Sequence, residues 1–595
     1  MIGVIRTGLV VPHKGTHKGD IMSWSHRPSV LPAVIATMIT LVLVVLSGVP
    51  AASHAPSGES PPSSAVASIA AAASMPVQPA ASSALPDPYK TTEYNASRHE
   101  YRLTIDGVRR DVVAYLPVPE NPMLAVVDRP IIVLLHATGG NYGPDSYKGM
   151  MEFLAKNGFV VVAPTWDAHA YSVVDQNADT ASEVYGSPAR VIKTVIDDSY
   201  RRFEAHTFSD QVVLMGHSVG GAGVVRAADA IGNTWIHDRR VRIKSVVAMA
   251  PAPKDRDMRE RHALAGKSSS FLVMMVAKDE DIHGIGSPDS VRDTGFKLYD
   301  VAGSEENLSA NAAALYPDKD LLFIKGGSHS TFRGTDPSLS GTMYSYRRFA
   351  AAYVNAYLRR HVYGEKVYDA YLLDGVRSPS SPDTLVYRQA HSSKNKLVVE
   401  NFQRGQGSTG SFYGGGSSSV GRIISSSTAL SFTRENSHRL TDSPHATRVL
   451  VTTWNTGATP YLEFDYANDQ RVDVSQYKYL GIRIGQIHNH RHNEVDTGKD
   501  LSVRLLTMSN GSRVLSDGAR MHVPYPFREW VRPQGQGTAE ATKSAMHTVI
   551  IPLDSFGAGV NLKNVDGLRI YLPGKGQVQI DNIEFFGERT VVPVY

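Results

Sequence analysis

The chain has 595 residues, 42% hydrophobic and 20% charged, which is the composition of a globular protein rather than a disordered, fibrous or polytopic membrane protein. At about 100–200 residues a domain, this length predicts two or three domains. Lys and Arg exceed Asp and Glu by 61 − 57 = 4 charges, too small a surplus to indicate nucleic-acid binding. The absence of cysteine excludes disulfides, thiol nucleophiles and thiolate zinc sites.

The N-terminal region has the pattern of an export signal. An apolar stretch at 30–49 follows several basic residues and precedes the small residues of 51–55. A basic flank, an apolar stretch and a small-residue end are typical of a secretory signal, so we expect 1–55 to be a signal peptide and the protein to be secreted. The alternative is an uncleaved anchor at the cell surface, which is the one case in which we expect membrane attachment. Residues 56–88, rich in Ala, Ser and Pro, predict a linker.

Residues 89–375 alternate between strand and helix patterns. Residues 101–116 predict a hairpin that turns at Gly107. Buried strands are predicted from short apolar runs at 131–135, 159–163, 212–215, 245–249, 271–276 and 321–324. Helical spacing of apolar residues appears at 147–154, 188–196 and 343–360. Strands that alternate with helices predict an α/β domain with a doubly wound, mostly parallel sheet.

A candidate nucleophile follows the predicted strand at 212–215. The motif Gly216-His217-Ser218-Val219-Gly220 lies between this strand and a predicted helix. Glycines on both sides of a serine permit a tight turn that lifts its hydroxyl out at the carboxyl edge of a sheet. We therefore expect Ser218 to be a catalytic nucleophile.

A serine nucleophile needs a base, and the base needs a carboxylate to orient it. His329 follows the last predicted strand on a Gly-rich loop, which is where the base is expected. The acid should follow the strand at 271–276, where Asp279, Glu280 and Asp281 compete. We prefer Asp279 because it is the first carboxylate after the strand, and Asp281 is the main alternative.

The oxyanion of such a reaction needs two backbone N–H donors. Val219, the residue after the nucleophile, is expected to supply one. The other should come from the loop after the strand at 131–135, with Thr138 as the preferred donor and Ala137 as the alternative. Tyr142 and Trp166 follow strand ends on the same edge, and we expect them to bind substrate, although core aromatics would show the same pattern.

These motifs together resemble the α/β-hydrolase fold over 89–375. The features are HATGG after one strand, GHSVGG at the nucleophile, an acid after FLVMMV and GGSH after the last strand. Within that superfamily the segment is similar to lidless serine esterases: dienelactone hydrolases, chlorophyllases, platelet-activating-factor acetylhydrolases and cutinase-like polyesterases. The resemblance implies a Ser-His-Asp triad, an ester substrate and no cofactor. The sequence departs at Ala137, where lipases often have Gly.

The C-terminal third changes to short alternating strands. Residues 376–396 are polar and predict a linker, so that a fragment 87–376 should fold alone. Strands predicted at 448–454, 479–484, 501–506, 547–552, 567–572 and 577–581 indicate an all-β jelly-roll sandwich over 397–590. Its ends resemble galactose-binding-like modules, which implies a carbohydrate-binding-like role. An exposed aromatic platform would come from Trp454, Trp530, Tyr525 or Phe527; the alternative is that these aromatics form a core and the domain stabilises the enzyme.

Metal binding has weak support. His488, His490 and His492 alternate along the chain, but a solvated loop explains them as well. Glu400 or Asp581 could hold a structural Ca²⁺, as such modules sometimes do. We expect no metal or other cofactor in catalysis.

We therefore expect a monomeric, secreted serine hydrolase that cleaves carboxylic esters through an acyl-enzyme. The substrate is expected to be an ester, polysaccharide- or polyester-based if it is polymeric. The alternatives are an acyltransferase or amidase with the same triad, and a non-catalytic extracellular binding protein on a hydrolase scaffold.

Overall fold

The computed structural model describes residues 85–91, 94–121, 128–138, 143–166, 188–236, 238–252, 264, 268, 270–279, 294–302, 317–333, 342–378, 380–381, 384–392, 396–402, 410–412, 420–466, 471–531 and 538–589. The expected signal peptide at 1–55 and most of the expected linker at 56–88 lie outside these ranges. Among the described helices, none is long and apolar enough to cross a membrane.

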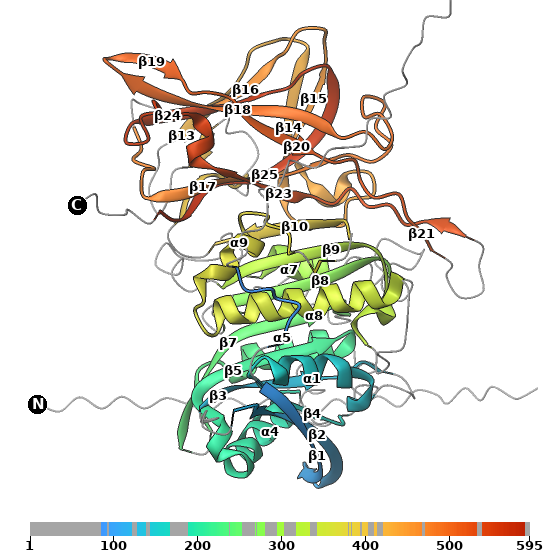
Figure 1. Ribbon diagram of the computed structural model, residues 1–595. Helices are drawn as coiled ribbons and strands as arrows, with labels where there is room; N and C mark the ends of the chain where they lie inside the picture. The colour runs from blue at the N-terminus through green and yellow to red at the C-terminus, as the bar shows by residue number, and fades with distance from the viewer. Residues whose placement is uncertain are drawn as a thin grey trace, which may run out of the picture. The chain divides into compact units, whose positions relative to one another are not determined.

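A ten-stranded mixed sheet forms the first part of the structure (Figure 1). Its strands are β1 (Tyr94–Ile105), β2 (Val108–Pro119), β3 (Arg129–Leu135), β4 (Val160–Pro164), β5 (Thr207–His217), β6 (Thr234–Ile236), β7 (Arg239–Met249), β8 (Ser270–Lys278), β9 (Asp318–Ser328) and β10 (Val386–His391). The order is β1-β2-β4-β3-β5-β7-β8-β9-β10, with β6 paired to β7. The central strands from β4 to β9 run parallel, and β1, β2 and β10 are antiparallel to their neighbours.

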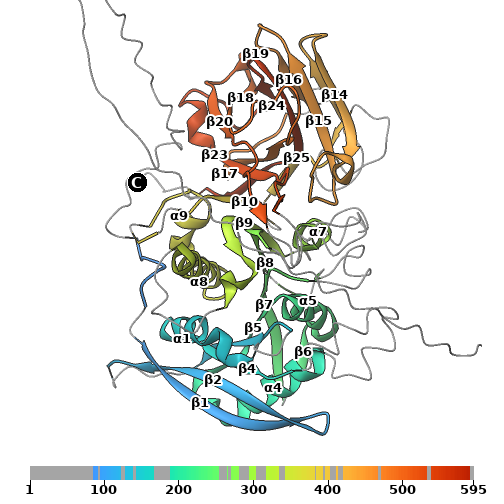
Figure 2. The ribbon, with the colours of Figure 1, turned by 90° about the vertical axis from the view of Figure 1, so that its right-hand side faces the viewer.

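Helices cover both faces of this sheet, as its doubly wound pattern predicts. They are α1 (Lys148–Lys156), α4 (Pro188–Arg202), α5 (Val219–Ile231), α7 (Thr294–Val301), α8 (Thr342–His361) and α9 (Asp369–Leu372). Figure 2 shows α1 and α8 on one face and α5 and α7 on the other, and α4 packs against α5. Because both faces of the sheet are covered, β3, β4 and β8 are mainly apolar and are buried almost throughout.

Strand β10 differs from the sequence expectation. It lies inside the segment 376–396, which we expected to be a linker, and it pairs antiparallel with β9. The strand escaped detection because its polar side chains are buried with polar partners. Arg388 contacts Asp320 at 2.6 Å, and Gln389 accepts a hydrogen bond of 2.8 Å from Arg483. The hydrophobic pattern of such a strand is the same as that of a loop, so the pattern alone cannot identify the strand.

The second part of the structure is all β. Its strands are β11 (Lys396–Glu400), β12 (Gly410–Phe412), β13 (Val420–Ser425), β14 (Leu430–Asn436), β15 (Arg448–Asn455), β16 (Tyr461–Asp465), β17 (Tyr477–Gln486), β18 (Lys499–Ser509), β19 (Ser512–Leu515), β20 (Ala519–Val523), β21 (Trp530–Val531), β22 (Ala539–Glu540), β23 (His547–Pro552), β24 (Val565–Tyr571) and β25 (Lys575–Glu588). One sheet has the order β14-β15-β25-β17-β23 with β11 on β25, and the other β12-β13-β16-β24-β18-β19 with β20 on β18. Side chains from both sheets form one hydrophobic core, including Trp454, Phe464 and Phe585, so this part is a sandwich.

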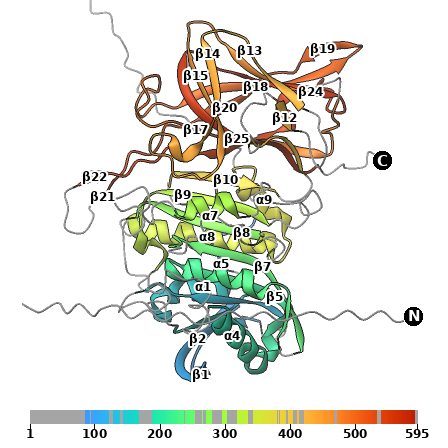
Figure 3. The same cartoon turned by 180° about the vertical axis from the view of Figure 1, so that it is seen from behind.

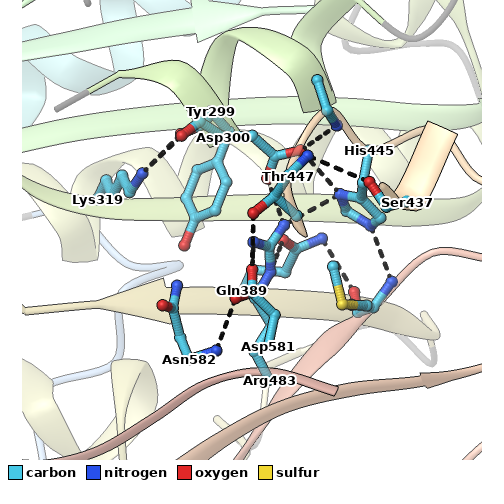
Figure 4. A network of polar contacts seen from close by, with 12 residues as sticks. Tyr299, Asp300, Lys319, Gln389, Ser437, His445, Thr447, Arg483, Asp581 and Asn582 are labelled. Atoms are coloured by element: carbon cyan, nitrogen blue, oxygen red, sulfur yellow. Dashed lines mark hydrogen bonds and ion pairs between the residues drawn. The ribbon is translucent and has the colours of Figure 1, made fainter. Parts of the chain in front are cut away.

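A buried polar network joins the two parts (Figure 4). Arg483 on β17 donates to Asp300 at the end of α7, and its Nη1 lies 2.7 Å from Oδ2 of Asp581 on β25. The ring of His445 lies 3.2 Å from the other oxygen of Asp300. Burial alone would raise the pKa of Asp300, but Arg483 and His445 hold that pKa below its usual value. The mixed sheet and the sandwich therefore share charged groups that water does not reach.

A short arm of the sandwich also reaches the mixed sheet. Residues 524–531 lead from β20 into the β21–β22 hairpin, which stands out from the sandwich in Figure 3. The ring of Phe527 lies 3.9 Å from the ring of Tyr387 and 5.6 Å from that of Phe323, measured between ring centroids. Phe527 thus belongs to the hydrophobic core of the mixed sheet.

Candidate active site

Ser218 lies at a sharp turn between β5 and α5, as the motif predicts. Its backbone has φ 56° and ψ −123°, a conformation that L-residues rarely adopt and that costs about 1–3 kcal/mol. The flanking glycines make the turn sterically feasible. A Cβ on Gly220 would lie 2.3 Å from the carbonyl oxygen of Leu135, and one on Gly216 would lie 2.2 Å from that of Gly220. The strained turn presents Ser218 at the carboxyl end of β5.

Backbone hydrogen bonds fix this turn to the neighbouring strand. The N–H of Ser218 donates to the carbonyl of Met249 at 2.9 Å, and the N–H of Ala252 donates to the carbonyl of Ser218 at 3.0 Å. Because the backbone is held on both sides, the position of the hydroxyl depends on only one side-chain torsion. Such preorganisation is what a nucleophile requires.

His329 and Asp279 form a buried pair. Nδ1 of His329 lies 3.0 Å from both carboxylate oxygens of Asp279, and the two side chains are 3% and 0% exposed. They emerge from adjacent parallel strands, because Lys278 at the end of β8 is in register with Ser328 at the end of β9. A carboxylate in this position orients the imidazole and stabilises its protonated form.

The loop with His329 touches the turn with Ser218. The rings of His217 and His329 lie 4.6 Å apart, measured between their centroids, so the residue before Ser218 packs on the predicted base. The structure thus brings Ser218, Asp279 and His329 to one edge of the sheet. Glu280 and Asp281, the alternative acids, lie outside the described residues, and the catalytic roles of all these residues stay predictions.

His217 has a different environment from His329. It is completely buried, and its Nδ1 lies 2.8 Å from the hydroxyl of Tyr147. Burial, reinforced by the nearby His329, holds the pKa of His217 well below its usual value, so its ring is neutral at physiological pH. His217 is therefore a packing partner of His329.

Tyr147 connects this histidine to the predicted oxyanion loop. Its hydroxyl accepts a hydrogen bond of 3.2 Å from the N–H of Ala137. The amide of Ala137 is thus already engaged, whereas the N–H of Thr138 makes no hydrogen bond within the described residues. This difference favours Thr138 over Ala137 as the second donor beside Val219, whose N–H begins α5. Sequence reasoning placed Tyr147 only in a helix pattern and missed this contact, which no motif marks.

Of the two residues expected to bind substrate, the structure describes only Trp166. Tyr142 lies outside the described residues. Trp166 is 5% exposed, and its Nε1 donates to the carbonyl of His136 at 2.9 Å. This contact joins Trp166 to the loop that follows β3, and the substrate contact of Trp166 stays a prediction.

The expected aromatic platform of the sandwich reduces to one residue. Trp454, Tyr525 and Phe527 are buried, so they belong to the core, as the alternative interpretation held. Trp530 on β21 is 50% exposed. It is therefore the one of the four aromatics with free surface for a ligand.

The residues considered for metal binding are engaged in protein contacts. Nδ1 of His488 lies 2.8 Å from Asp442, Glu400 contacts Arg434 at 3.2 Å, and Asp581 contacts Arg483. Within the described parts of the chain, no group of three or more His, Asp or Glu side chains is arranged to hold a metal ion.

Comparison with known proteins gives only distant structural similarity. No family model and no curated protein matches the chain. A fungal esterase from Rhizomucor miehei is 14% identical over 48% of this chain and 87% of its own length, with a TM-score of 0.30. A lidless α/β serine hydrolase from Xanthomonas campestris is 14% identical over 45% of this chain and 94% of its own, with a TM-score of 0.28.

A third solved structure is similar to a smaller share of the chain. It is a family 11 carbohydrate-binding module from Clostridium thermocellum, in complex with a β-1,3-1,4-mixed-linked tetrasaccharide. It is 12% identical over 33% of this chain and 98% of its own, with a TM-score of 0.22. TM-scores this low carry no inference about activity, which must rest on the geometry of Ser218, Asp279 and His329.

Proposed function

We propose that the protein is a serine hydrolase that cleaves carboxylic esters through an acyl-enzyme. The observation that carries this proposal is the buried His329–Asp279 pair, 3.0 Å apart, packed against the strained turn of Ser218. A buried imidazole with a carboxylate on Nδ1 has its Nε2 available as a base, and a serine at such a turn is the group it would activate.

The residues would act in two half-reactions. Oγ of Ser218 attacks the ester carbonyl while Nε2 of His329 takes the hydroxyl proton, and the N–H groups of Val219 and Thr138 bind the oxyanion. Collapse of this intermediate expels the alcohol, which takes the proton from His329. A water molecule then attacks the acyl-enzyme by the same route, and the carboxylic acid leaves while Ser218 regains its proton. Asp279 orients the ring of His329 throughout.

The setting of this reaction is also part of the proposal. Export follows from the signal pattern at 1–55, with cell-surface anchoring as the alternative. The sandwich is then an accessory domain for an extracellular ester, polymeric if the exposed Trp530 stacks on it. This part is supported by the sequence pattern and by the exposure of one aromatic residue.

The decisive experiment is active-site labelling with a fluorophosphonate probe, which reacts with activated serines. The full chain should be labelled, and Ser218→Ala should abolish labelling and lower kcat on p-nitrophenyl esters by at least about 10³-fold. Ser97→Ala, on β1 at the far edge of the sheet, is the matched control and should change neither. Labelling that survives Ser218→Ala, or a wild-type chain that never labels, would refute the proposal.

The acid is tested in the same assay. Asp279→Asn should leave the protein folded and lower kcat by up to about 10⁴-fold, because the imidazole loses the partner that sets its tautomer. Asp281→Asn is the matched control, and the reverse result would make Asp281 the acid. Product analysis with an added alcohol separates hydrolysis from acyl transfer, since a transferase would form mostly the new ester.

A further inference from the structure

His136 makes a set of contacts that the proposed reaction does not use. It directly follows β3 and precedes Ala137 and Thr138, and it is buried, with 5% of its surface exposed. Nδ1 of its ring lies 2.8 Å from the carbonyl oxygen of Ala137. The backbone N–H of Trp166 donates to the other ring nitrogen, Nε2, at 3.3 Å. Each ring nitrogen of His136 therefore has a partner in the protein.

These two contacts decide which ring nitrogen of His136 carries the proton. Because Nε2 faces the N–H of Trp166, it must be the acceptor, and it can accept only when it is unprotonated. Burial lowers the pKa of His136 below its usual value, so the ring carries a single proton at physiological pH. That proton is on Nδ1, which donates a hydrogen bond to the carbonyl of Ala137.

The hydrogen bond to Ala137 fixes the plane of the next peptide group. The carbonyl of Ala137 and the N–H of Thr138 belong to one trans peptide, in which the two groups point in opposite directions. Because the ring of His136 holds the carbonyl, the N–H of Thr138 is turned away from this ring. The N–H of the preceding peptide donates to Tyr147 at 3.2 Å. Its carbonyl accepts a hydrogen bond of 2.9 Å from Nε1 of Trp166.

The loop with these peptides also lies against the start of α5. A Cβ on Gly220 would lie 2.6 Å from the carbonyl oxygen of His136, so the backbone of this glycine is in close contact with the loop. Gly220 follows Val219, whose N–H is the other proposed oxyanion donor. The loop of Thr138 and the N–H of Val219 therefore lie at the same end of α5.

We propose that His136 is a positioning residue of the oxyanion hole. Its ring holds the peptide between Ala137 and Thr138 so that the N–H of Thr138 faces the oxyanion. This inference rests on the proposed function, because it concerns the second donor of that reaction. The oxyanion forms only in the transition state and the intermediate, so kcat rather than KM depends on the orientation of this donor.

The test compares two substitutions of nearly the same size, His136→Leu and His136→Asn, in the full chain. Both lose the ring and the acceptor for Trp166, but the side-chain amide of Asn can donate to the carbonyl of Ala137 as Nδ1 does. On a p-nitrophenyl ester, His136→Leu should lower kcat at least about tenfold and leave KM within about twofold. His136→Asn should keep kcat within about threefold of the wild type.

A trifluoromethyl ketone gives a second measurement, because its adduct with Ser218 carries the oxyanion. Its Ki should rise in His136→Leu in step with the loss of kcat and should return toward the wild-type value in His136→Asn. Should His136→Leu fail to fold, His136→Phe keeps a ring without nitrogens and is the second variant without a donor. The control is His361→Phe on α8, where the histidine lies beside the start of β9, and it should leave kcat unchanged.

The outcomes separate this inference from the proposed function. Full kcat in a folded His136→Leu protein, an equal loss in His136→Asn, or an effect on KM alone would overturn the role of His136. The proposed function is judged by fluorophosphonate labelling of the wild type and by its loss in Ser218→Ala. A wild type that is labelled and hydrolyses esters would keep the proposed function even if His136 proved dispensable.

Discussion

The ammonium group of Lys278 lies 3.3 Å from the carboxylate of Glu529, and this ion pair joins the sandwich to the strand end that carries the predicted acid. Lys278 directly precedes Asp279, and its partner across the strands, Ser328, directly precedes His329. Glu529 is buried, with 6% of its side chain exposed, although Lys278 is 46% exposed. The sandwich therefore contacts the end of β8, next to the point where Asp279 and His329 leave the sheet.

Further contacts hold the arm at 524–531 against the mixed sheet. The hydroxyl of Tyr387 donates to the carbonyl of Tyr525, and Phe527 packs between Tyr387 and Phe323. On the other side, the N–H of Ala541 donates to the carbonyl of Glu529 at 2.8 Å, which ties the arm to the return strand. The arm thus packs against the ends of strands in the mixed sheet. A binding module that is independent of the enzyme domain would not make such contacts.

Removal of the Glu529 charge should affect turnover more than stability. We expect Glu529→Gln to lower kcat two- to tenfold with KM nearly unchanged, because the ends of β8 and β9 lose a fixed contact while the substrate site stays intact. The control is Asp374→Asn, which breaks a 3.2 Å pair between Lys478 of the sandwich and the segment after α9. Steady-state kinetics on a p-nitrophenyl ester decides the matter. Equal effects of the two variants would reduce Glu529 to a general interface contact.

The network around Arg483 predicts a large stability difference between two arginines. Arg483→Met removes the guanidinium that pairs with the buried carboxylates of Asp300 and Asp581, and it should cost about 3–5 kcal/mol of unfolding free energy. Arg520→Met removes an arginine that is 61% exposed and paired with the exposed Asp500, and should cost at most about 1 kcal/mol. Urea unfolding followed by circular dichroism measures both. A cost below about 1 kcal/mol for Arg483→Met would show that water reaches these carboxylates in solution.

Truncation tests whether the mixed sheet can exist without the sandwich. From the sequence we expect a fragment 87–376 to fold alone, but the structure predicts the opposite. The cut removes β10, uncovers the edge of β9 and takes away Phe527 from the core of the sheet. We expect the fragment to be insoluble or unfolded, as judged by expression, gel filtration and circular dichroism. A soluble, folded fragment that hydrolyses small esters at full rate would restore the independent-module interpretation.

Sequence pattern predicted the central architecture well because its signals are local. The parallel strands appear as continuous apolar runs, and the hairpin at Gly107 and the turn at Ser218 have the residues that their backbone requires. Strand β10 and the arm at 524–531 were missed because they are stabilised by partners far away in sequence, such as Asp320 and Lys278. A single sequence does not show whether a polar residue is paired with water or with a buried charged group.

The same limit applies to the candidate site. The strand-end rule was enough to propose Ser218, Asp279 and His329, because a parallel sheet gathers the residues after its strands on one edge. It could not foresee Tyr147, which bridges Ala137 and His217, or the burial of Nε and Nη1 of Arg347 with no hydrogen-bond partner among the described residues. Both depend on how helices pack against the sheet, and helix periodicity specifies a buried face without naming its partners.

The final prediction concerns the close packing of the backbone around the turn at Ser218. Gly220→Ala keeps every proposed catalytic group, but its Cβ would lie 2.3 Å from the carbonyl oxygen of Leu135 and 2.6 Å from that of His136. Both neighbours are backbone atoms of the strand and loop that lead to Thr138, so the clash cannot be relieved by rotating a side chain. Either α5 must move away from β3, or the loop with the predicted oxyanion donor must move.

We therefore expect Gly220→Ala to lower kcat at least tenfold and to lower the unfolding free energy by about 1–3 kcal/mol, as overpacking of a tight core does. Gly457→Ala is the matched control, because a Cβ at that glycine meets nothing within 4 Å and its change should leave both quantities within error. Ester kinetics and thermal unfolding on the two proteins give the comparison. If Gly220→Ala kept full activity and stability, α5 would lie farther from β3 in solution than it does in the structure. The proposed mechanism would then not depend on the tight turn at Ser218.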